Sequence, residues 1–469
     1  MYCNELLLHR SIKCPTGTLF DGCREKDASM AGDHRITFNK ENIKVDTSIR
    51  EKTTEMAVTR SEKRGEELFR TLPFDDKCRY LDGMSPKEKL DLLLGDPDDT
   101  KLTRAMPPQD FYWLFKAIGA SDAMELLGMA SPRQSLFLLD MELWRGWEFS
   151  EDKAVEFLGY IMKGSEEHFL ELLPHLDFNL LSLLLGRELV VAGGIGDLNT
   201  DEERQTDWDH TFDDVFLIKF KNPQHSQIIG SFLELVCRFD NSLYTALMES
   251  VSGEIDIESE EECYRIKSGR LADLGFPSHD EAIEIYSRIN PVTFVPSLSK
   301  VLLQTGEATT LPDMYLTGKT FLERVILLID SELFRMELNY LINTALVADQ
   351  AHHDDTEYMK SVVERVYGYL NIALEYLCHG DEAKGAEILS GEHLKSLFQL
   401  GFSIVLGLKF TAEKHADSSY ATGKVLSGLK SSRPHFYRGL DDDGIDGYRE
   451  FRDLQDVTKM ADFLKELGA

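Results

Sequence analysis

The residues best suited to metal chemistry lie in the segment His352-His353-Asp354-Asp355. Imidazole and carboxylate groups are the ligands of hydrolytic metal centres. Adjacent histidines point in different directions, so this cluster needs further ligands from elsewhere in the chain to close a site. We interpret the segment first as a solvated turn that caps the next helix. A metal-assisted hydrolytic site around His352, His353 and Asp354 is the alternative.

Three other segments match known sites only in part. A second acidic cluster with one histidine, residues 207–214, has the same two interpretations as the first. Residues 313–320 end in Gly-Lys-Thr like a phosphate-binding loop, but aspartate replaces the first glycine and no strand precedes them. Residues 442–453 have Gly444 where a calcium loop has an oxygen ligand, and they lack its final glutamate. We interpret all three as loops and expect no cofactor.

Clustered aromatic residues suggest binding rather than catalysis. Tyr112 and Trp113 are adjacent, and Trp144 is followed closely by Trp147. Helical spacing predicts that most of these side chains belong to the core, where aromatic groups bury large areas. The alternative is a pocket for a protein partner, because Trp and Tyr are favoured anchors of interfaces.

The composition limits the class of protein. The net charge of −31 disfavours nucleic acid and favours a basic protein partner and weak, diffuse binding of divalent cations. The most apolar stretch, residues 397–410, is too short for a membrane span and contains Gln399 and Lys409. The seven cysteines are scattered, which is typical of a reduced cytoplasmic protein.

Proline recurs at short intervals behind residues that begin helices, as in Ser85-Pro86, Asp96-Pro97, Pro107-Pro108 and Ser131-Pro132. Proline is tolerated at the first position of a helix, and Ser and Asp are good N-caps. The interval is about one short helix and a turn, and such helices are stable only when they stack. We therefore predict an α-helical superhelix, a solenoid of short helices, over residues 65–191.

The rest of the chain also has mainly helical periodicity. We expect a flexible leader over residues 1–64 and an acidic, glycine-rich linker over residues 192–213. A mostly helical domain should follow over residues 214–415, with a short strand at 215–220 and a capping box formed by Ser278 and Glu281. Residues 416–469 are expected to be an acidic tail with a last helix at 454–467. The predicted fold class is mainly α, with at most a few short strands.

Residues 65–190 resemble the intracellular N-terminal domains of MgtE-type magnesium transporters, and more loosely the short-helix repeats of the flagellar switch protein FliG. The matching segments are Leu72-Pro73-Phe74-Asp75-Asp76, Met84-Ser85-Pro86-Lys87-Glu88 and Met106-Pro107-Pro108-Gln109-Asp110. The resemblance implies stacked short helices and a response to Mg²⁺ through acidic surfaces. Because we expect no membrane span, magnesium transport itself is excluded.

The chain from about residue 65 onward is similar to an uncharacterised bacterial family of unknown function. The segments GRLADLGFP, residues 269–277, and LNYLINTALVADQ, residues 338–350, carry this resemblance. It implies no activity. We therefore expect a cytoplasmic protein-interaction scaffold or regulatory binding module rather than an enzyme. The alternatives are the metal-assisted hydrolase and a regulator that responds to divalent cations.

Overall fold

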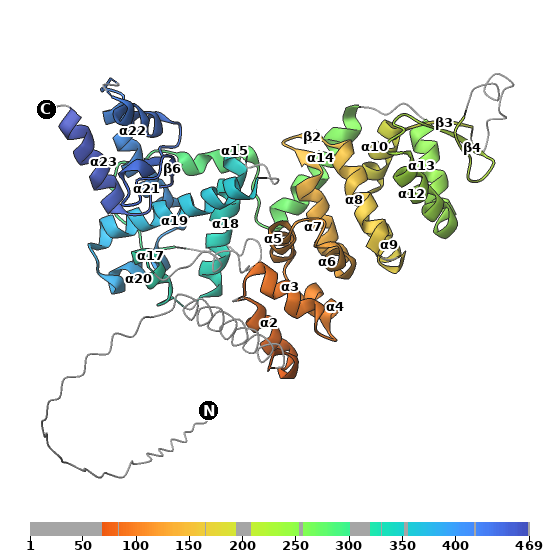
Figure 1. Cartoon of the computed structure of the whole chain (residues 1–469), viewed down its shortest axis with the longest axis horizontal. Coiled ribbons are helices and arrows are strands. Elements are labelled where there is room, and N and C mark those ends of the chain that lie inside the picture. Colours follow the sequence, from red (N-terminus) through yellow and green to blue (C-terminus); the bar gives the residue numbers. More distant parts are fainter. Residues whose placement is uncertain are drawn as a thin grey trace, which may run out of the picture. The chain divides into compact units, whose positions relative to one another are not determined.

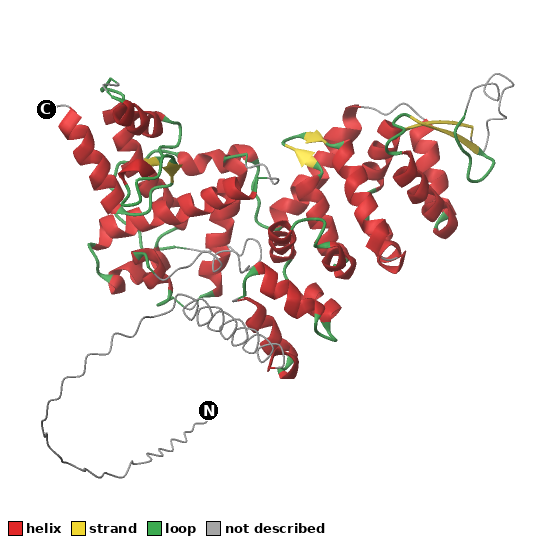
Figure 2. Ribbon diagram, viewed as in Figure 1, coloured by secondary structure: helices red, strands yellow, loops and turns green. Residues whose placement is uncertain are grey.

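The computed structural model describes residues 68–82, 84–164, 166–193, 208–252, 257–300, 319–329, 331–350, 355–416 and 419–467. Within these ranges the chain is mainly helical, with three short antiparallel strand pairs (Figure 2). The mainly α fold class predicted from the sequence is confirmed. Residues 65–469 form one compact unit.

The first group of elements, with short helices joined by tight turns, runs to residue 193 (Figure 1). It comprises α2 (Phe74–Asp82), α3 (Pro86–Leu94), α4 (Asp99–Ala105), α5 (Pro108–Ile118), α6 (Met124–Met129), α7 (Pro132–Glu142), β1 (Trp144–Arg145), β2 (Glu148–Phe149), α8 (Glu151–Gly164), α9 (Glu166–Leu172), η1 (Leu173–His175), α10 (Phe178–Glu188) and β3 (Leu189–Gly193).

The second group contains the longer helices. It comprises β4 (Phe216–Phe220), α12 (Ser226–Phe239), α13 (Asn241–Ser252), α14 (Ile257–Asp273), α15 (His279–Ile283), η2 (Glu284–Tyr286), α17 (Phe321–Ile326), α18 (Glu332–Ala348), α19 (Thr356–Cys378), α20 (Glu382–Gly391), α21 (Leu394–Ala412), α22 (Tyr420–Lys430), β5 (Phe436–Tyr437), η3 (Arg438–Leu440), β6 (Tyr448–Arg449) and α23 (Leu454–Leu467).

The helix starts predicted at Ser85-Pro86, Pro107-Pro108 and Ser131-Pro132 are confirmed. The start predicted at Asp96-Pro97 is wrong, because Pro97 lies in a turn and α4 begins at Asp99. Ser85 and Ser131 are N-caps with reciprocal capping boxes, and proline occupies the first position of both α3 and α7. Ser278 caps α15 in the same way through Glu281. These starts are predictable because the capping contacts join residues only three positions apart. The short strand and the last helix also form, as β4 and α23.

In the first group, each of several helices packs on the next but one along the chain: α3 packs on α5, α5 on α7 and α7 on α9 (Figure 1). The segment that we expected to separate two domains, residues 192–213, is bridged by contacts. Strand β3, which includes residues 192 and 193 of this segment, pairs antiparallel with β4, and α12 and α13 pack against α8 and α10. Helix α14 packs against α10 and α7, so the helices that follow β4 extend the packing of the first group.

The remaining helices pack around α18, α19 and α21. Helix α18 also contacts the first group through three buried amides. The side-chain amide of Gln109, on α5, donates from Nε2 to Oδ1 of Asn343 at 2.7 Å. The side-chain amide of Asn339 donates from Nδ2 to Oε1 of Gln109 at 3.0 Å. Because buried amides are costly unless hydrogen-bonded, this cluster fixes how α5 meets α18.

Helix α21 contains the apolar stretch of residues 397–410 but is longer than that stretch. Its 19 residues are sufficient, by length and composition alone, to cross a membrane, and half of the apolar window is buried. The bent pair formed by residues 166–175 and 178–188 meets the same criterion together. Packing of α21 against α19, α22 and α23 accounts for its apolar character as a core helix. The lack of a membrane span stays a prediction.

Close contact between α19 and α21 depends on Gly401. A Cβ atom at this position would overlap the backbone carbonyl of Tyr369, whereas one at Gly407, on the same helix, would meet nothing within 4 Å. We expect Gly401→Ala to lower the free energy of unfolding by more than about 2 kcal/mol, because packed helix backbones must separate. Gly407→Ala should raise it by about 0.5–1 kcal/mol through helix propensity. Urea denaturation measures both, and equal effects would contradict this packing.

Candidate functional site

A groove with a volume of about 1160 Å³ opens between α14 and the end of α18. Its lining comes from five parts of the chain: the end of α7 with the β1–β2 hairpin, Lys153 at the start of α8, α14, the start of α15 with the turn before it, and the end of α18. Apolar and aromatic side chains form much of its wall. They are Met141, Trp144, Trp147, Tyr264, Leu271, Phe276 and Leu346.

The β1–β2 hairpin presents two tryptophans to the groove. Trp144 is only 6% exposed and packs edge-on against Phe149 and Tyr264, at ring-centroid distances of 5.4 and 5.6 Å. Trp147 lies in the two-residue turn and is 75% exposed. Gly146 precedes it with a φ of 64°, a conformation that a two-residue hairpin turn requires and glycine adopts readily. The turn therefore holds a large aromatic side chain at the mouth of the groove.

Ion pairs attach α14 to the first group. Arg270 donates both its Nε and Nη2 hydrogens to the buried Asp140 carboxylate of α7, at 2.8 and 2.7 Å. The Glu260 carboxylate accepts a hydrogen bond from the backbone N–H of Phe149 at 2.9 Å and another from Arg187 at 2.5 Å. Bidentate arginine–carboxylate pairs fix orientation as well as distance. The face of α14 that contains Tyr264 and Lys267 is thereby held towards Trp144.

The opposite wall is held by His279. Its Nδ1 lies 3.2 Å from the Val347 carbonyl oxygen, and its Nε2 lies 3.2 Å from the side-chain nitrogen of Gln350. A ring protonated at Nδ1 satisfies both contacts, because it donates to the carbonyl and accepts from the amide. His279 thus joins the start of α15 to the end of α18.

Lys267 is the most unusual charged residue of the groove. The half-buried side chain places Nζ 5.5 Å from the Trp144 ring centroid and 5.1 Å from that of Tyr264. Burial lowers the pKa of Lys267 to about 8, although the Asp140 carboxylate acts in the opposite direction. In the described part of the chain, Lys267 forms no ion pair. Its charge is stabilised by aromatic faces rather than by a carboxylate.

The predicted partner-binding residues separate into two pairs. Tyr112 and Trp113, on α5, are buried in the hydrophobic core, and the Tyr112 hydroxyl donates a hydrogen bond to Glu142 at 2.8 Å. Trp144 and Trp147 line the groove together. Whether any of the four binds a partner stays a prediction.

The predicted metal ligands His352, His353 and Asp354 lie outside the described residues. Among the residues that are described, no three His, Cys, Asp or Glu side chains are placed to hold a metal ion. In the second acidic cluster, Asp209 and Asp213 accept hydrogen bonds from backbone N–H groups around β4. In the phosphate-loop segment, Thr320 caps α17 with Glu323.

The sequence analysis missed Lys267 and Tyr264. Both lie on α14, together with Leu271, at spacings of three and four residues that place them on one helix face. That spacing was visible in the sequence. The residues that this helix contacts at the groove, Trp144 and Asp140, lie more than a hundred positions earlier in the chain, so the contacts could not be predicted from spacing.

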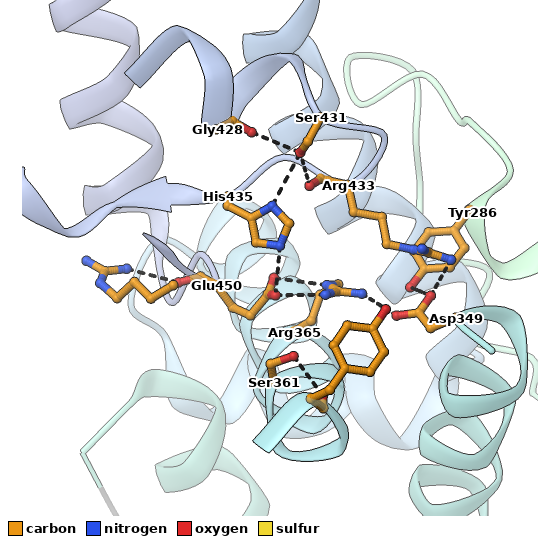
Figure 3. A network of polar contacts seen from close by, with 11 residues as sticks. Tyr286, Asp349, Ser361, Arg365, Gly428, Ser431, Arg433, His435 and Glu450 are labelled. Carbon is orange, nitrogen blue, oxygen red and sulfur yellow. Dashed lines mark hydrogen bonds and ion pairs between the residues drawn. The ribbon is translucent and has the colours of Figure 1, made fainter. Parts of the chain in front are cut away.

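A second polar site is buried in the C-terminal part (Figure 3). The guanidinium of Arg365, on α19, donates from Nε and Nη2 to the two oxygens of Glu450 at 2.9 and 2.8 Å. Its Nη1 contacts Asp349, whose other oxygen accepts from the Tyr286 hydroxyl at 2.8 Å. Arg433 also pairs with Asp349 and donates to the Ala348 carbonyl at 3.0 Å. Burial would raise the pKa of Glu450, but hydrogen bonds from His435 and Arg365 hold it below its ordinary value.

Three residues at the edge of this network have the identities of a hydrolytic triad. His435 lies between Ser431 and Glu450, 3.3 Å from the hydroxyl and 3.4 Å from the carboxylate (Figure 3). The Ser431 hydroxyl also contacts the Gly428 and Arg433 carbonyls, and both Glu450 oxygens accept from Arg365. A triad needs a serine that gives its proton to the imidazole and a carboxylate that orients the ring. Here both groups are engaged elsewhere, so we interpret the network as structural.

The fold and the groove define a mainly helical protein with an aromatic-lined groove. The chain belongs to the family of unknown function DUF6178, whose model matches residues 66–469. This confirms the predicted membership of an uncharacterised family, whereas the resemblance to MgtE-type domains is not confirmed. Comparison with curated proteins and with solved structures gives no match.

The buried Arg365 network predicts an unequal response of two arginines. Arg365→Met leaves the carboxylates of Asp349 and Glu450 buried with fewer partners, so we expect the free energy of unfolding to fall by about 3–5 kcal/mol. Arg438→Met removes a partly exposed pair with Asp443 and should cost at most about 1 kcal/mol. Chemical denaturation of both variants measures the difference. A loss below about 1 kcal/mol for Arg365→Met would contradict the role assigned to this pair.

The environment of Lys267 predicts unusual reactivity. Only the neutral amine reacts with acylating reagents, so its acetylation rate should rise with pH and reach half its maximum near pH 8. Lys101 is the matched control, because its hydrogen bond to Asp98 raises its pKa, and its rate should still be rising at about pH 10. Trace labelling with acetic anhydride, read by peptide mass spectrometry, gives both profiles. Coincident profiles would contradict the environment described for Lys267.

Proposed function

We propose that this protein is a cytoplasmic protein-interaction module, and that the groove receives a segment of a partner protein. The observation that carries the proposal is the exposed Trp147 at the mouth of a large groove lined by Trp144, Tyr264 and Phe276. Large exposed tryptophans beside apolar pockets are typical anchors of protein interfaces. The volume of about 1160 Å³ exceeds the range of about 300–1,000 Å³ that is usual for small-molecule sites.

The arrangement of the first group supports a binding scaffold. Each of several short helices packs on the helix two positions along, as expected for stacked helical hairpins. We infer that these helices form a superhelical array and that the hairpin holding Trp147 projects from it. Superhelical arrays commonly bind other proteins along their extended surfaces.

Two further observations support the setting of this function. Among the described cysteines, Cys237, Cys263 and Cys378 form no disulfide, which agrees with a reducing compartment. The net charge of −31 favours approach of a partner that is basic overall, because long-range attraction increases the rate of association.

The test uses random peptides displayed on phage, selected on the wild-type protein and then synthesised. We expect selected peptides to bind Trp147→Ala more weakly by about 2 kcal/mol or more, about 30-fold in Kd. The control is Tyr420→Ala, which removes another highly exposed aromatic side chain away from the groove. Isothermal titration calorimetry measures the affinities. Equal binding to wild type and Trp147→Ala, or loss of binding in both variants, would contradict the proposal.

A further inference from the structure

The groove contains a cation that the protein leaves without a counter-ion. Lys267 forms no ion pair or hydrogen bond within the described residues and lies over two aromatic rings. Both carboxylate oxygens of Asp140, the acidic neighbour of Lys267 on α7, accept hydrogen bonds from Arg270. Half-burial has removed part of the hydration of Lys267 without supplying an anion, so an anionic ligand group would gain more here than at an exposed lysine.

Most of the other charged groups that line the groove already have polar partners. Glu142 is paired with Lys116 and Glu262 with Arg265, whereas the Glu281 carboxylate accepts a hydrogen bond from the Ser278 backbone in the cap of α15. Lys153 is paired with Glu156. In the described structure, the charged lining residues without an ion pair are Lys267, Arg145, Glu261 and Glu281. The acidic and basic residues that line the groove balance, so the groove lacks the acidic excess of the chain, whose net charge is −31.

The net charge of the whole chain and the unpaired lysine in the groove together favour one kind of ligand. The net charge of −31 repels a segment that contains several acidic residues. The unpaired ammonium group nevertheless favours one carboxylate, and the walls favour apolar side chains around it. A free C-terminus supplies one carboxylate without any acidic residue, and it does so even on a partner that is basic overall.

We propose that the groove binds the apolar C-terminal end of a partner protein, with the terminal carboxylate paired to the ammonium group of Lys267. The side chains next to the carboxylate pack against the half-buried Tyr264 and Leu271 and the exposed face of Trp147. This inference rests on the proposed function, and it names the part of the partner that the groove recognises.

The test uses two pools of fluorescent synthetic peptides that differ only at the C-terminus. Both pools have apolar last residues after a lysine-rich stretch; one ends in a free carboxylate and the other in an amide. A charge-assisted hydrogen bond at Lys267 should make the free acids bind about tenfold more tightly than the amides. Fluorescence anisotropy with the full-length chain measures both affinities.

Two variants assign the effect to this lysine. Lys267→Met keeps an apolar side chain of similar length and should abolish the difference between acid and amide. Lys424→Met should preserve the difference, because Lys424 also lies over a tyrosine ring but does not line the groove. Circular dichroism confirms that both variants are folded.

The remaining outcomes overturn the inference in different ways. Equal binding of acids and amides, lost in Trp147→Ala, would leave the groove as a protein-binding site but exclude recognition of a terminus. Tight binding of amidated peptides with an internal Asp or Glu would assign Lys267 to a side-chain carboxylate instead. Failure of both pools to bind, while displayed internal peptides bind, would exclude a C-terminal ligand and leave the proposed function standing.

Discussion

The packing of the C-terminal part depends most on the buried ion pairs that the Arg365 guanidinium forms with Asp349 and Glu450. The guanidinium joins Asp349, at the end of α18, to Glu450, which follows β6, and so fixes three distant segments around one charge. The residues just before Asp349, Leu346 and Val347, form one wall of the groove. A buried charge tolerates few arrangements, because each unpaired partner would be costly. The position of that wall is therefore set by a contact outside the groove.

The opposite wall is positioned by ion pairs of another kind. Arg270 and Arg187 attach α14 to Asp140 and Glu260, and Phe149 donates its backbone N–H to the same Glu260. These contacts engage both oxygens of Asp140 and both oxygens of Glu260. Lys267 consequently faces aromatic rings and the open groove instead of an acidic neighbour. The structural ion pairs thus leave the Lys267 ammonium group, among the described residues, without a carboxylate partner.

Global and local electrostatics have different consequences in this protein. The net charge of −31 acts over the whole surface and is screened beyond about 10 Å at moderate ionic strength. Contact between a ligand and Lys267 is governed instead by the few charges within the groove, where acidic and basic residues balance and Lys267 has no carboxylate partner among the described residues. A partner can therefore be basic overall and still present one carboxylate. Amino-acid composition alone predicted only that the partner is basic overall.

The sequence by itself determined the mainly helical class and many helix starts, because capping contacts such as Ser85 with Glu88 join residues three positions apart. It also singled out Trp144 and Trp147 by residue type. Only the tertiary structure separated them from the buried Tyr112 and Trp113, and only it brought Lys267 beside Trp144. Those outcomes depend on contacts such as Arg270 with Asp140, which span 130 positions. Such contacts leave no local periodicity or spacing in the chain, because they form only when the helices pack.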